Sequence, residues 1–310
     1  MDKATLVETL ENISTSSYSW ALYFFKIDRR NNNPYTAHKV RFKTNEYLST
    51  YANTLVKMIV KYQLGKINEI KEYTGENTKV SCDSITTSSE LVKEQWDYFV
   101  LDIAEASDEK VEGKYHGYVL EGVPANRDEK SVVFLKIANP IITLKNKRNA
   151  VFTFDSNSEL SEMADEVCKL YMDTDCIVVD EHIYSFNYKF EDLFNIEKTM
   201  QKVKNKAIDA IVKIDAFDDR EQFELLAKAY KSPRTFITLK SERVERIKNK
   251  GKRKKIADML KIDVSEEGKF KFKNKEEVSL LIRYLCFKVF KDDETKELLE
   301  ANNVTQLTLQ

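Results

Sequence analysis

Glycine and proline are scarce in this chain, with 7 and 4 copies among 310 residues. Because these two residues punctuate turns and long loops, we expect a chain dense in regular secondary structure. The glycines form no G-x-G-x-x-G phosphate-binding loop. Gly117 and Gly122 have the outer spacing of a P-loop, but Val123 and Pro124 follow where Lys and Ser/Thr are needed. Nucleotide hydrolysis is therefore not expected.

Long apolar runs are also missing. The longest, Trp20 to Phe25, has six residues, whereas a helix needs about 20 to cross a bilayer. The N-terminal sequence MDKATLVETLEN is acidic and amphipathic, unlike a signal peptide. We expect a cytoplasmic protein.

Cysteine and histidine are too few and too scattered for most sites built from them. The four cysteines form no C-x-x-C pair and are Cys82, Cys168, Cys176 and Cys286. They indicate reduced core residues of a reducing compartment. The three histidines have no close Cys or His partner and are His38, His116 and His182. We expect no zinc or other metal site, no cofactor, and no nucleophilic triad, since a G-x-S-x-G elbow is absent as well.

Apolar residues spaced three and four apart predict five helices. The expected helices cover residues 44–62, 156–171, 196–211, 218–230 and 278–289. Polar residues typical of helix starts support three of them: Thr44, the Ser156-x-x-Glu159 box and the Asp218-x-x-Glu221 box.

Short runs rich in aromatic and β-branched residues predict strands that are apolar on both faces, as in a sheet covered by helices. The expected strands are residues 20–27, 115–123, 132–137 and 150–154, followed by a hairpin of 176–179 and 183–186 that turns at Asp180 and Glu181. The order predicts an α+β fold. An N-terminal mixed sheet covered by helices would form domain 1–187, and a mainly helical, basic domain would form 188–310.

Charge is sorted along the chain. Residues 243–255 read RVERIKNKGKRKK and carry a net charge of +7 in a chain whose net charge is −1. Their basic residues are Arg243, Arg246, Lys248, Lys250, Lys252, Arg253, Lys254 and Lys255. Sorted charge favours a polyanionic partner, and a run of this kind gains affinity for nucleic acid by releasing counterions. We predict that these residues contact DNA, on a helical surface interrupted near Gly251.

A second basic stripe lies on the polar side of the expected helix 196–211, at Lys198, Lys202 and Lys206. It is a further candidate for DNA contact, with a plain solvated face as the alternative.

The acidic complement lies in residues 155–181, where nine acids stand against Lys169 alone. The acids are Asp155, Glu159, Glu162, Asp165, Glu166, Asp173, Asp175, Asp180 and Glu181. A DNA duplex would repel this stretch. We therefore expect it to face a protein partner, another copy of the chain, or solvent.

One enzymatic alternative stays open. A Mg²⁺-dependent nuclease needs carboxylates that hold the metal, commonly with a Glu-x-Lys pair. The pattern occurs, among other places, at residues 69–71, 112–114 and 267–269. In a chain that is 33% charged, three such triplets are expected by chance, and none follows an acid at the end of a clear strand. We do not expect an enzyme.

The middle of the chain carries a family pattern. Residues 132–200 contain FLKIANPIITL, NAVFTFD and CIVVDEHIYSFNYKFEDLFN, followed by an expected helix. The most specific part is the hairpin that runs into Phe190-Glu191, a Phe-Glu pair that starts a helix after a short aromatic strand. This pattern resembles the KwaB-like family of the bacterial Kiwa anti-phage defence system.

The resemblance implies a cytoplasmic, non-enzymatic DNA-binding effector that restrains phage DNA replication and gene expression. It also implies a small polytopic membrane partner, KwaA, peripheral association with the inner face of the membrane, and a homodimer or higher homo-oligomer. It brings no catalytic residues. Without a recognition motif, DNA binding should be sequence-nonspecific. A scaffold whose basic run touches anionic lipid headgroups is a further alternative.

Overall fold

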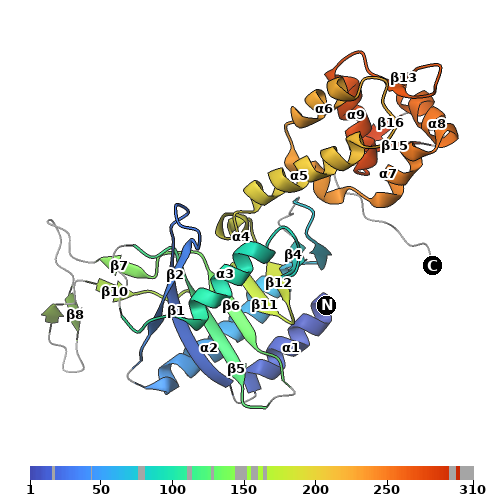
Figure 1. Cartoon of the computed structure of the whole chain (residues 1–310). Coiled ribbons are helices and arrows are strands. Elements are labelled where there is room, and N and C mark those ends of the chain that lie inside the picture. The colour runs from blue at the N-terminus through green and yellow to red at the C-terminus, as the bar shows by residue number, and fades with distance from the viewer. Residues whose placement is uncertain are drawn as a thin grey trace. The chain divides into compact units, whose positions relative to one another are not determined.

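A computed structural model represents the chain. It describes residues 1–15, 18–42, 44–75, 81–109, 114–126, 129–143, 152–154, 160–162, 166–292 and 298–300. The chain divides into two compact units, the first ending at Asn195 and the second starting at Ile196, with a short segment from Thr74 also counted in the second. Figure 1 shows the elements of both units, coloured by residue number.

The first unit combines helices with a large sheet. Its helices are α1 (Lys3–Thr15), α2 (Asn45–Met58), a π-helical turn (Ile59–Gln63), a 3₁₀ turn (Leu64–Lys66), α3 (Lys93–Ala104) and α4 (Lys189–Leu193). Its main strands are β1 (Tyr18–Ile27), β2 (Tyr35–Val40), β3 (Glu69–Glu72), β4 (Ser81–Thr86), β5 (Gly117–Pro124), β6 (Val132–Lys136), β11 (Cys176–Val179) and β12 (His182–Ser185).

These eight strands form one mixed sheet in the order β2-β1-β5-β6-β11-β12-β4-β3. All neighbours pair antiparallel except β3 and β4, which are parallel. The β11–β12 hairpin turns at Asp180 and Glu181, whose φ angles are 51° and 60°. Two successive residues with positive φ match a type I′ turn, which fits the twist of the flanking strands. The predicted hairpin and the predicted mixed sheet are confirmed.

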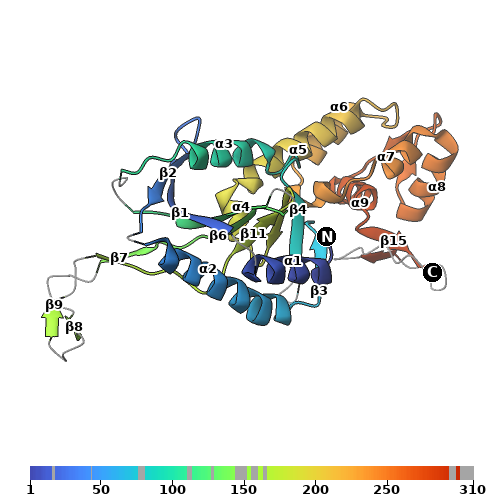
Figure 2. The same ribbon diagram turned by 90° about the horizontal axis from the view of Figure 1, so that it is seen from below.

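Helices cover both faces of the sheet. Figure 2 shows α1 and α2 on one face and α3 on the other. On the α1–α2 side, Leu22 and Phe24 of β1 are buried in the core that contains Leu6. On the α3 side, the Phe99 ring lies 5.3 Å from the Phe25 ring, centroid to centroid. Strand β1 is therefore apolar on both faces because both faces are covered.

The second unit is mainly helical. Its elements are α5 (Ile196–Val212), α6 (Arg220–Lys228), a 3₁₀ turn (Pro233–Thr238), α7 (Ser241–Lys248), α8 (Lys250–Leu260), β13 (Asp263–Val264), β14 (Phe270–Lys271), α9 (Lys275–Leu285), β15 (Val289–Lys291) and β16 (Leu298–Glu300). Stacked aromatic rings lie in its core, with the Phe217 and Phe223 centroids 4.0 Å apart. The α+β fold class is confirmed.

The expected helix over residues 156–171 is wrong. Leu160–Glu162 is strand β9, which pairs with β8 (Phe152–Phe154). Glu166–Cys168 is strand β10, which pairs with β7 (Ile141–Thr143). The capping residues Ser156 and Glu159 lie outside the described residues. A few apolar residues at helical spacing also fit short strands, and pairing with neighbouring segments decides between the two.

Three smaller expectations also need correction. Helix α6 is capped by Asp219, whose side chain accepts a hydrogen bond from Gln222 N, one residue later than the expected box. Val289 belongs to strand β15 rather than to the end of α9. Cys168 is exposed, while the other three cysteines are buried, and all four are free thiols. No helix in the described part of the chain is long and apolar enough to cross a membrane.

Candidate nucleic-acid interface

The basic run folds as two helices with a break at Asn249. Helix α7 ends at Lys248 and α8 begins at Lys250, and Asn249 has an extended backbone (φ −85°, ψ 121°). Its side chain accepts a hydrogen bond from Lys252 N at 3.0 Å, which is the usual role of Asn at a helix N-cap. The interruption expected near Gly251 therefore lies at Asn249, and Gly251 is inside α8.

Arg253 lies in the interior of the second unit. Only 5% of the residue is exposed. Its guanidinium donates hydrogen bonds to Gly268 O at 2.6 Å, Asp215 O at 2.8 Å and Ile247 O at 3.0 Å. Carbonyl groups from three separate segments thus hold the charge inside the fold. Arg253 has no surface to offer a phosphate, so its expected DNA contact is withdrawn.

Arg243 is half-buried and also held by the fold. Its Nη1 donates to Tyr284 O at 2.5 Å and to Val289 O at 3.2 Å. The guanidinium carbon lies 4.4 Å from the centroid of the Tyr284 ring and 3.8 Å from that of Phe287. Burial lowers the pKa of Arg243 from its ordinary value. The main role of Arg243 is therefore to hold α7 against α9, and its guanidinium is only partly exposed to solvent.

Arg246 and Lys248 are exposed but paired within α7. Arg246 Nη2 donates to Glu242 at 2.6 Å, and Lys248 donates to Glu245. The hydrogen bond that Arg246 donates to Glu242, together with one involving Tyr284, raises the pKa of Arg246. Exposed pairs of this kind stabilise a helix by only about 0.3–0.5 kcal/mol. A stronger anion can therefore compete with the glutamates for both cations.

Four lysines of α8 form what we call the α8 lysine surface: Lys250, Lys252, Lys254 and Lys255. All four are exposed. Among the described residues, no acidic side chain forms an ion pair with any of them. The opposite side of α8 packs into the core through Ile256, Ala257 and Leu260. The helix thus turns its apolar side inward and its lysines to solvent.

A groove of about 550 Å³ lies between α7, α8, α9 and β15. Its lining residues are Arg243, Arg246, Lys255, Asp258, Met259, Tyr284, Phe290 and Lys291. Four are basic and one is acidic, and the exposed ring is Phe290, at 42%. We call this the Phe290 groove. The sequence analysis missed Tyr284, Phe290 and Lys291, although an aromatic residue between lysines in KVFK, residues 288–291, is typical of nucleic-acid contacts.

The second basic stripe lies on α5. Lys198, Lys202 and Lys206 are all exposed. Lys204, on the same helix, is buried, and its amine donates to Lys228 O at 2.7 Å and Tyr230 O at 2.6 Å. Burial lowers the pKa of Lys204. Lys204 therefore holds the end of α6, and the three exposed lysines remain a second candidate for DNA contact.

Among the described acids of residues 155–181, three form ion pairs within the first unit. Asp173 and Asp175 pair with Lys136, and Asp180 pairs with Lys130. Asp155, Glu159 and Asp165 lie outside the described residues, as do the side chains of Glu162 and Glu166. The expected role of this stretch as a protein contact surface stays a prediction.

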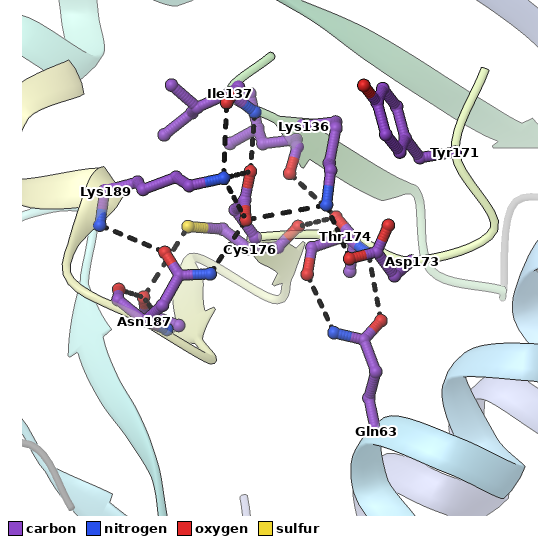
Figure 3. Close-up of polar contacts among 12 residues, drawn as sticks. Gln63, Lys136, Ile137, Tyr171, Asp173, Thr174, Cys176, Asn187 and Lys189 are labelled. Atoms are coloured by element: carbon purple, nitrogen blue, oxygen red, sulfur yellow. Dashed lines mark hydrogen bonds and ion pairs between the residues drawn. The ribbon is translucent and has the colours of Figure 1, made fainter. Parts of the chain in front are cut away.

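Asp175 is the centre of a polar network, and Figure 3 labels its partners Ile137, Asn187 and Lys189. Its side chain is 2% exposed. It accepts hydrogen bonds from Ile137 N at 2.7 Å, Asn187 Nδ2 at 2.7 Å and Lys189 Nζ at 3.3 Å. Lys136, with a side chain 7% exposed, lies 2.5 Å from Asp173 and 3.7 Å from Asp175. The two amines offset the carboxylate charge, as burial requires.

The next residue extends the network to the helical side. Thr174 N donates to Gln63 Oε1 at 2.9 Å, and Gln63 Nε2 donates to Thr174 O at 2.8 Å. Gln63 ends the π-helical turn that follows α2, so this pair ties that turn to the segment before β11. The sequence analysis had placed Asp175 in an acidic surface, and its burial was missed. The network joins sheet, turn and α4, which is a structural task.

The Glu-x-Lys triplets lie at separate places. Glu69 and Lys71 form a 2.9 Å ion pair on β3, and Glu267 and Lys269 form another between β13 and β14. Residues 112 and 113 of the third triplet lie outside the described residues. In the described part of the chain, no three His, Cys, Asp or Glu side chains converge as metal ligands. The expectation that the protein is not an enzyme stays a prediction.

Comparison with known proteins gives one match. A family model described as Kiwa protein KwaB-like matches residues 123–295. The match covers more than half of the chain and includes Asp175, the α8 lysine surface and the Phe290 groove. No curated protein and no solved structure matches.

Proposed function

We propose that this chain, which belongs to the Kiwa protein KwaB-like family, binds DNA in Kiwa anti-phage defence through the α8 lysine surface. Family membership supports the role in defence. The observation that carries DNA binding is the exposure of Lys250, Lys252, Lys254 and Lys255 on one helix without ion pairs to described residues.

Lysines without ion pairs are suited to DNA binding because binding releases counterions from the DNA. Each lysine that neutralises a phosphate displaces condensed counterions, and the gain in entropy favours the complex at low salt. A lysine already paired with a glutamate gains less, since the existing pair must first be given up. The four α8 lysines pay no such cost, whereas Arg246 and Lys248 do.

DNA binding of this kind should not depend on base sequence. The contacts go to phosphates, which carry no sequence information directly. The protein would therefore cover phage DNA wherever the DNA is accessible and restrain its replication and expression. A footprint confined to one sequence in the presence of competitor DNA would contradict this.

The charge-removal experiment compares two variants with equal loss of charge. In the first, Lys250, Lys252, Lys254 and Lys255 are changed to Ala. Removing about four phosphate contacts should reduce the slope of log K against log salt by about 3–4 units. Fluorescence anisotropy with a labelled duplex at several salt concentrations gives the slope, and circular dichroism shows whether the fold is intact.

The matched control removes four exposed lysines of the first unit: Lys39, Lys57, Lys61 and Lys66. Its slope should stay within about one unit of wild type, since only the general charge has changed. An unchanged slope in the α8 variant would move the DNA surface elsewhere, with the stripe of Lys198, Lys202 and Lys206 tested next. A wild-type protein that binds no DNA would overturn the proposal.

The same preparation tests the enzymatic alternative. Plasmid is incubated with the protein and Mg²⁺, and the products are separated on a gel. A mobility shift without cleavage supports a binding protein. Nicking that Glu69→Ala or Glu267→Ala abolishes would instead identify a nuclease, with that triplet at its centre.

The assembly proposed with this function rests on the family. The protein acts with the membrane protein KwaA at the inner face of the membrane, and it self-associates as a homodimer or higher homo-oligomer. Light scattering at micromolar concentration should give a mass of at least twice 36.2 kDa. Recovery only in the soluble fraction of cells that express KwaA would contradict the membrane association.

A further inference from the structure

The Phe290 groove combines an accessible aromatic ring with positive charge. In strand β15, Val289 is buried at 3% while Phe290 is exposed at 42%. A single exposed phenyl ring is ordinary on a protein surface. This ring, however, lines a groove together with Arg246, Lys255 and Lys291.

The other ring of the groove has a different task. Tyr284 is 6% exposed, and the Arg243 guanidinium lies over it, held by Tyr284 O and Val289 O. This stack and its hydrogen bonds fix the floor of the groove. Phe290 is then the ring with a face left for a ligand.

The charge of the groove favours an anion. Asp258 is its one carboxylate, against four cations. Arg246, Lys255 and Lys291 are exposed, and the Glu242 partner of Arg246 is an exposed i,i+4 residue rather than a buried one. A ligand with one flat ring and an adjacent negative charge matches both features.

We propose that the Phe290 groove binds an unpaired nucleotide, with the base stacked on Phe290 and the adjacent phosphate between Arg246, Lys255 and Lys291. Bases inside a duplex are stacked on each other and cannot reach a protein ring, whereas single strands, gaps and frayed ends expose them. This deepens the proposed DNA binding and rests on it. Lys255 belongs to both sites, so a strand lying along the α8 lysine surface leads directly into the groove.

The consequence is a preference for DNA structure over DNA sequence. The α8 lysine surface holds any DNA backbone, while the groove adds affinity only where a base is unpaired. Phage DNA that is entering, replicating or being repaired has such bases. The protein would thus favour active phage DNA over closed duplex.

The test changes the ring and leaves the charges in place. Phe290→Leu removes the stacking face but keeps an apolar side chain, and Phe290→Tyr keeps the ring. For a single-stranded oligothymidine, Phe290→Leu should weaken binding by about 5- to 150-fold, the range for loss of one stacked base. Phe290→Tyr should bind within about threefold of wild type. For a relaxed, covalently closed circular duplex, which has neither ends nor loops, all three proteins should bind alike.

The pattern separates this inference from the proposed function. If the α8 lysine variant weakens both ligands while Phe290→Leu weakens only the single strand, both stand. If Phe290→Leu weakens neither ligand or both equally, the groove assignment is wrong and the lysine surface is unaffected. Loss of self-association in Phe290→Leu, measured by light scattering on the same samples, would reassign the ring to a protein contact.

A titration with dTMP identifies the source of the nucleotide. A strand gains most of its affinity from neighbouring phosphates, so dTMP alone should not saturate the groove below millimolar concentration. Saturation at micromolar dTMP that Phe290→Leu abolishes would keep the base-and-phosphate chemistry but assign it to a free nucleotide. Competition by inorganic phosphate equal to that by dTMP would overturn the stacking of a base.

Discussion

Lysine serves opposite purposes in the two charged regions of this molecule. In the Asp175 network, Lys136 is buried between two aspartates, and its amine lies 5.1 Å from the centroid of the Tyr171 ring. On α8, Lys254 is exposed and forms no ion pair with a described acid. The first cation is committed to the fold, and the second is left for a partner. Charged residues in a sequence therefore indicate a binding surface only after the charges that the fold itself uses have been left out of the count.

The same contrast occurs between neighbours in the basic run. Arg253 donates to three backbone carbonyls inside the second unit, and Lys254, the next residue, points to solvent. A guanidinium suits the interior role because it offers five donors in a rigid plane. An ammonium on a flexible stem suits a moving polyanion. The two neighbours can be exchanged for alanine separately, which makes the contrast testable.

The largest effect should come from the buried network. Asp175→Ala would leave the Asn187 amide and the Ile137 N–H without their acceptor, and the buried Lys136 amine with Asp173 alone. Breaking a buried pair by removing one partner costs about 3–5 kcal/mol. We expect the free energy of unfolding of the first unit, measured by urea titration, to fall by that amount.

The control for this prediction is Asp173→Ala. Asp173 also pairs with Lys136, but its side chain is 51% exposed, so water can replace it. Its loss should cost less than about 1 kcal/mol. Equal effects for the two aspartates would mean that burial does not decide the value of these charges, and the comparison between the two regions would fail.

Arg253→Ala should have the next largest effect, in the second unit. It removes three charge-assisted hydrogen bonds, to Gly268, Asp215 and Ile247. Buried hydrogen bonds to charged groups contribute about 1.5–3 kcal/mol each, with partial compensation by water, so we expect a loss of about 3 kcal/mol. Hydrogen exchange should report the opening of α8 and of the β13–β14 hairpin.

The matched variant is Lys254→Ala, one residue further along the same helix. Its unfolding free energy should stay within about 0.5 kcal/mol of wild type, as for most surface substitutions. Its DNA salt slope should fall by about 0.9 units, the value of one phosphate contact. A stable Arg253→Ala protein with a reduced salt slope would reverse the roles assigned to the two residues.

Local patterns predicted the parts of the fold that depend on local interactions. The hairpin at Asp180 and Glu181 has two strands joined by a tight turn, and helix α5 has a clear 3.6-residue period. Strands β3 and β4 were missed. They pair in parallel, and the sequence SCDSIT of β4 mixes polar and apolar residues, with Asp83 buried at 3%. Such a strand is specified by its neighbours in space rather than by its own sequence.

The candidate site was also predicted only in part, because composition does not show which residues the fold buries. Composition located the basic run but could not distinguish Arg253 from Lys254, because both count as one charge. The helical period contains the missing information: Arg253, Ile256, Ala257 and Leu260 are spaced three, four and seven apart and share the buried side of α8. The sequence KVFK around Phe290 is typical of nucleic-acid contacts, but its place beside the basic run could not be predicted, since only the fold brings β15 to α7 and α8.

The smallest expected effect concerns the paired cations of α7, which lie between the two extremes. Glu242→Gln with Glu245→Gln would release Arg246 and Lys248 from their surface pairs. Each lost pair should cost stability of about 0.3–0.5 kcal/mol, while each released cation can engage one more phosphate. We expect tighter DNA binding at low salt and a slope steeper by about 1–2 units.

The control carries the same charge change at Glu46 of α2 and Glu221 of α6. Neither change releases a cation of α7, so only the general charge of the protein changes, and the slope should steepen by less than about 0.5 units. If both double variants bind DNA alike, net charge alone sets the affinity and α7 takes no part in the contact. If the α7 variant binds DNA more tightly at 50 mM salt and the difference fades at 300 mM, then Arg246 and Lys248 can contact DNA, and in the wild type the two glutamates compete with the DNA for these cations.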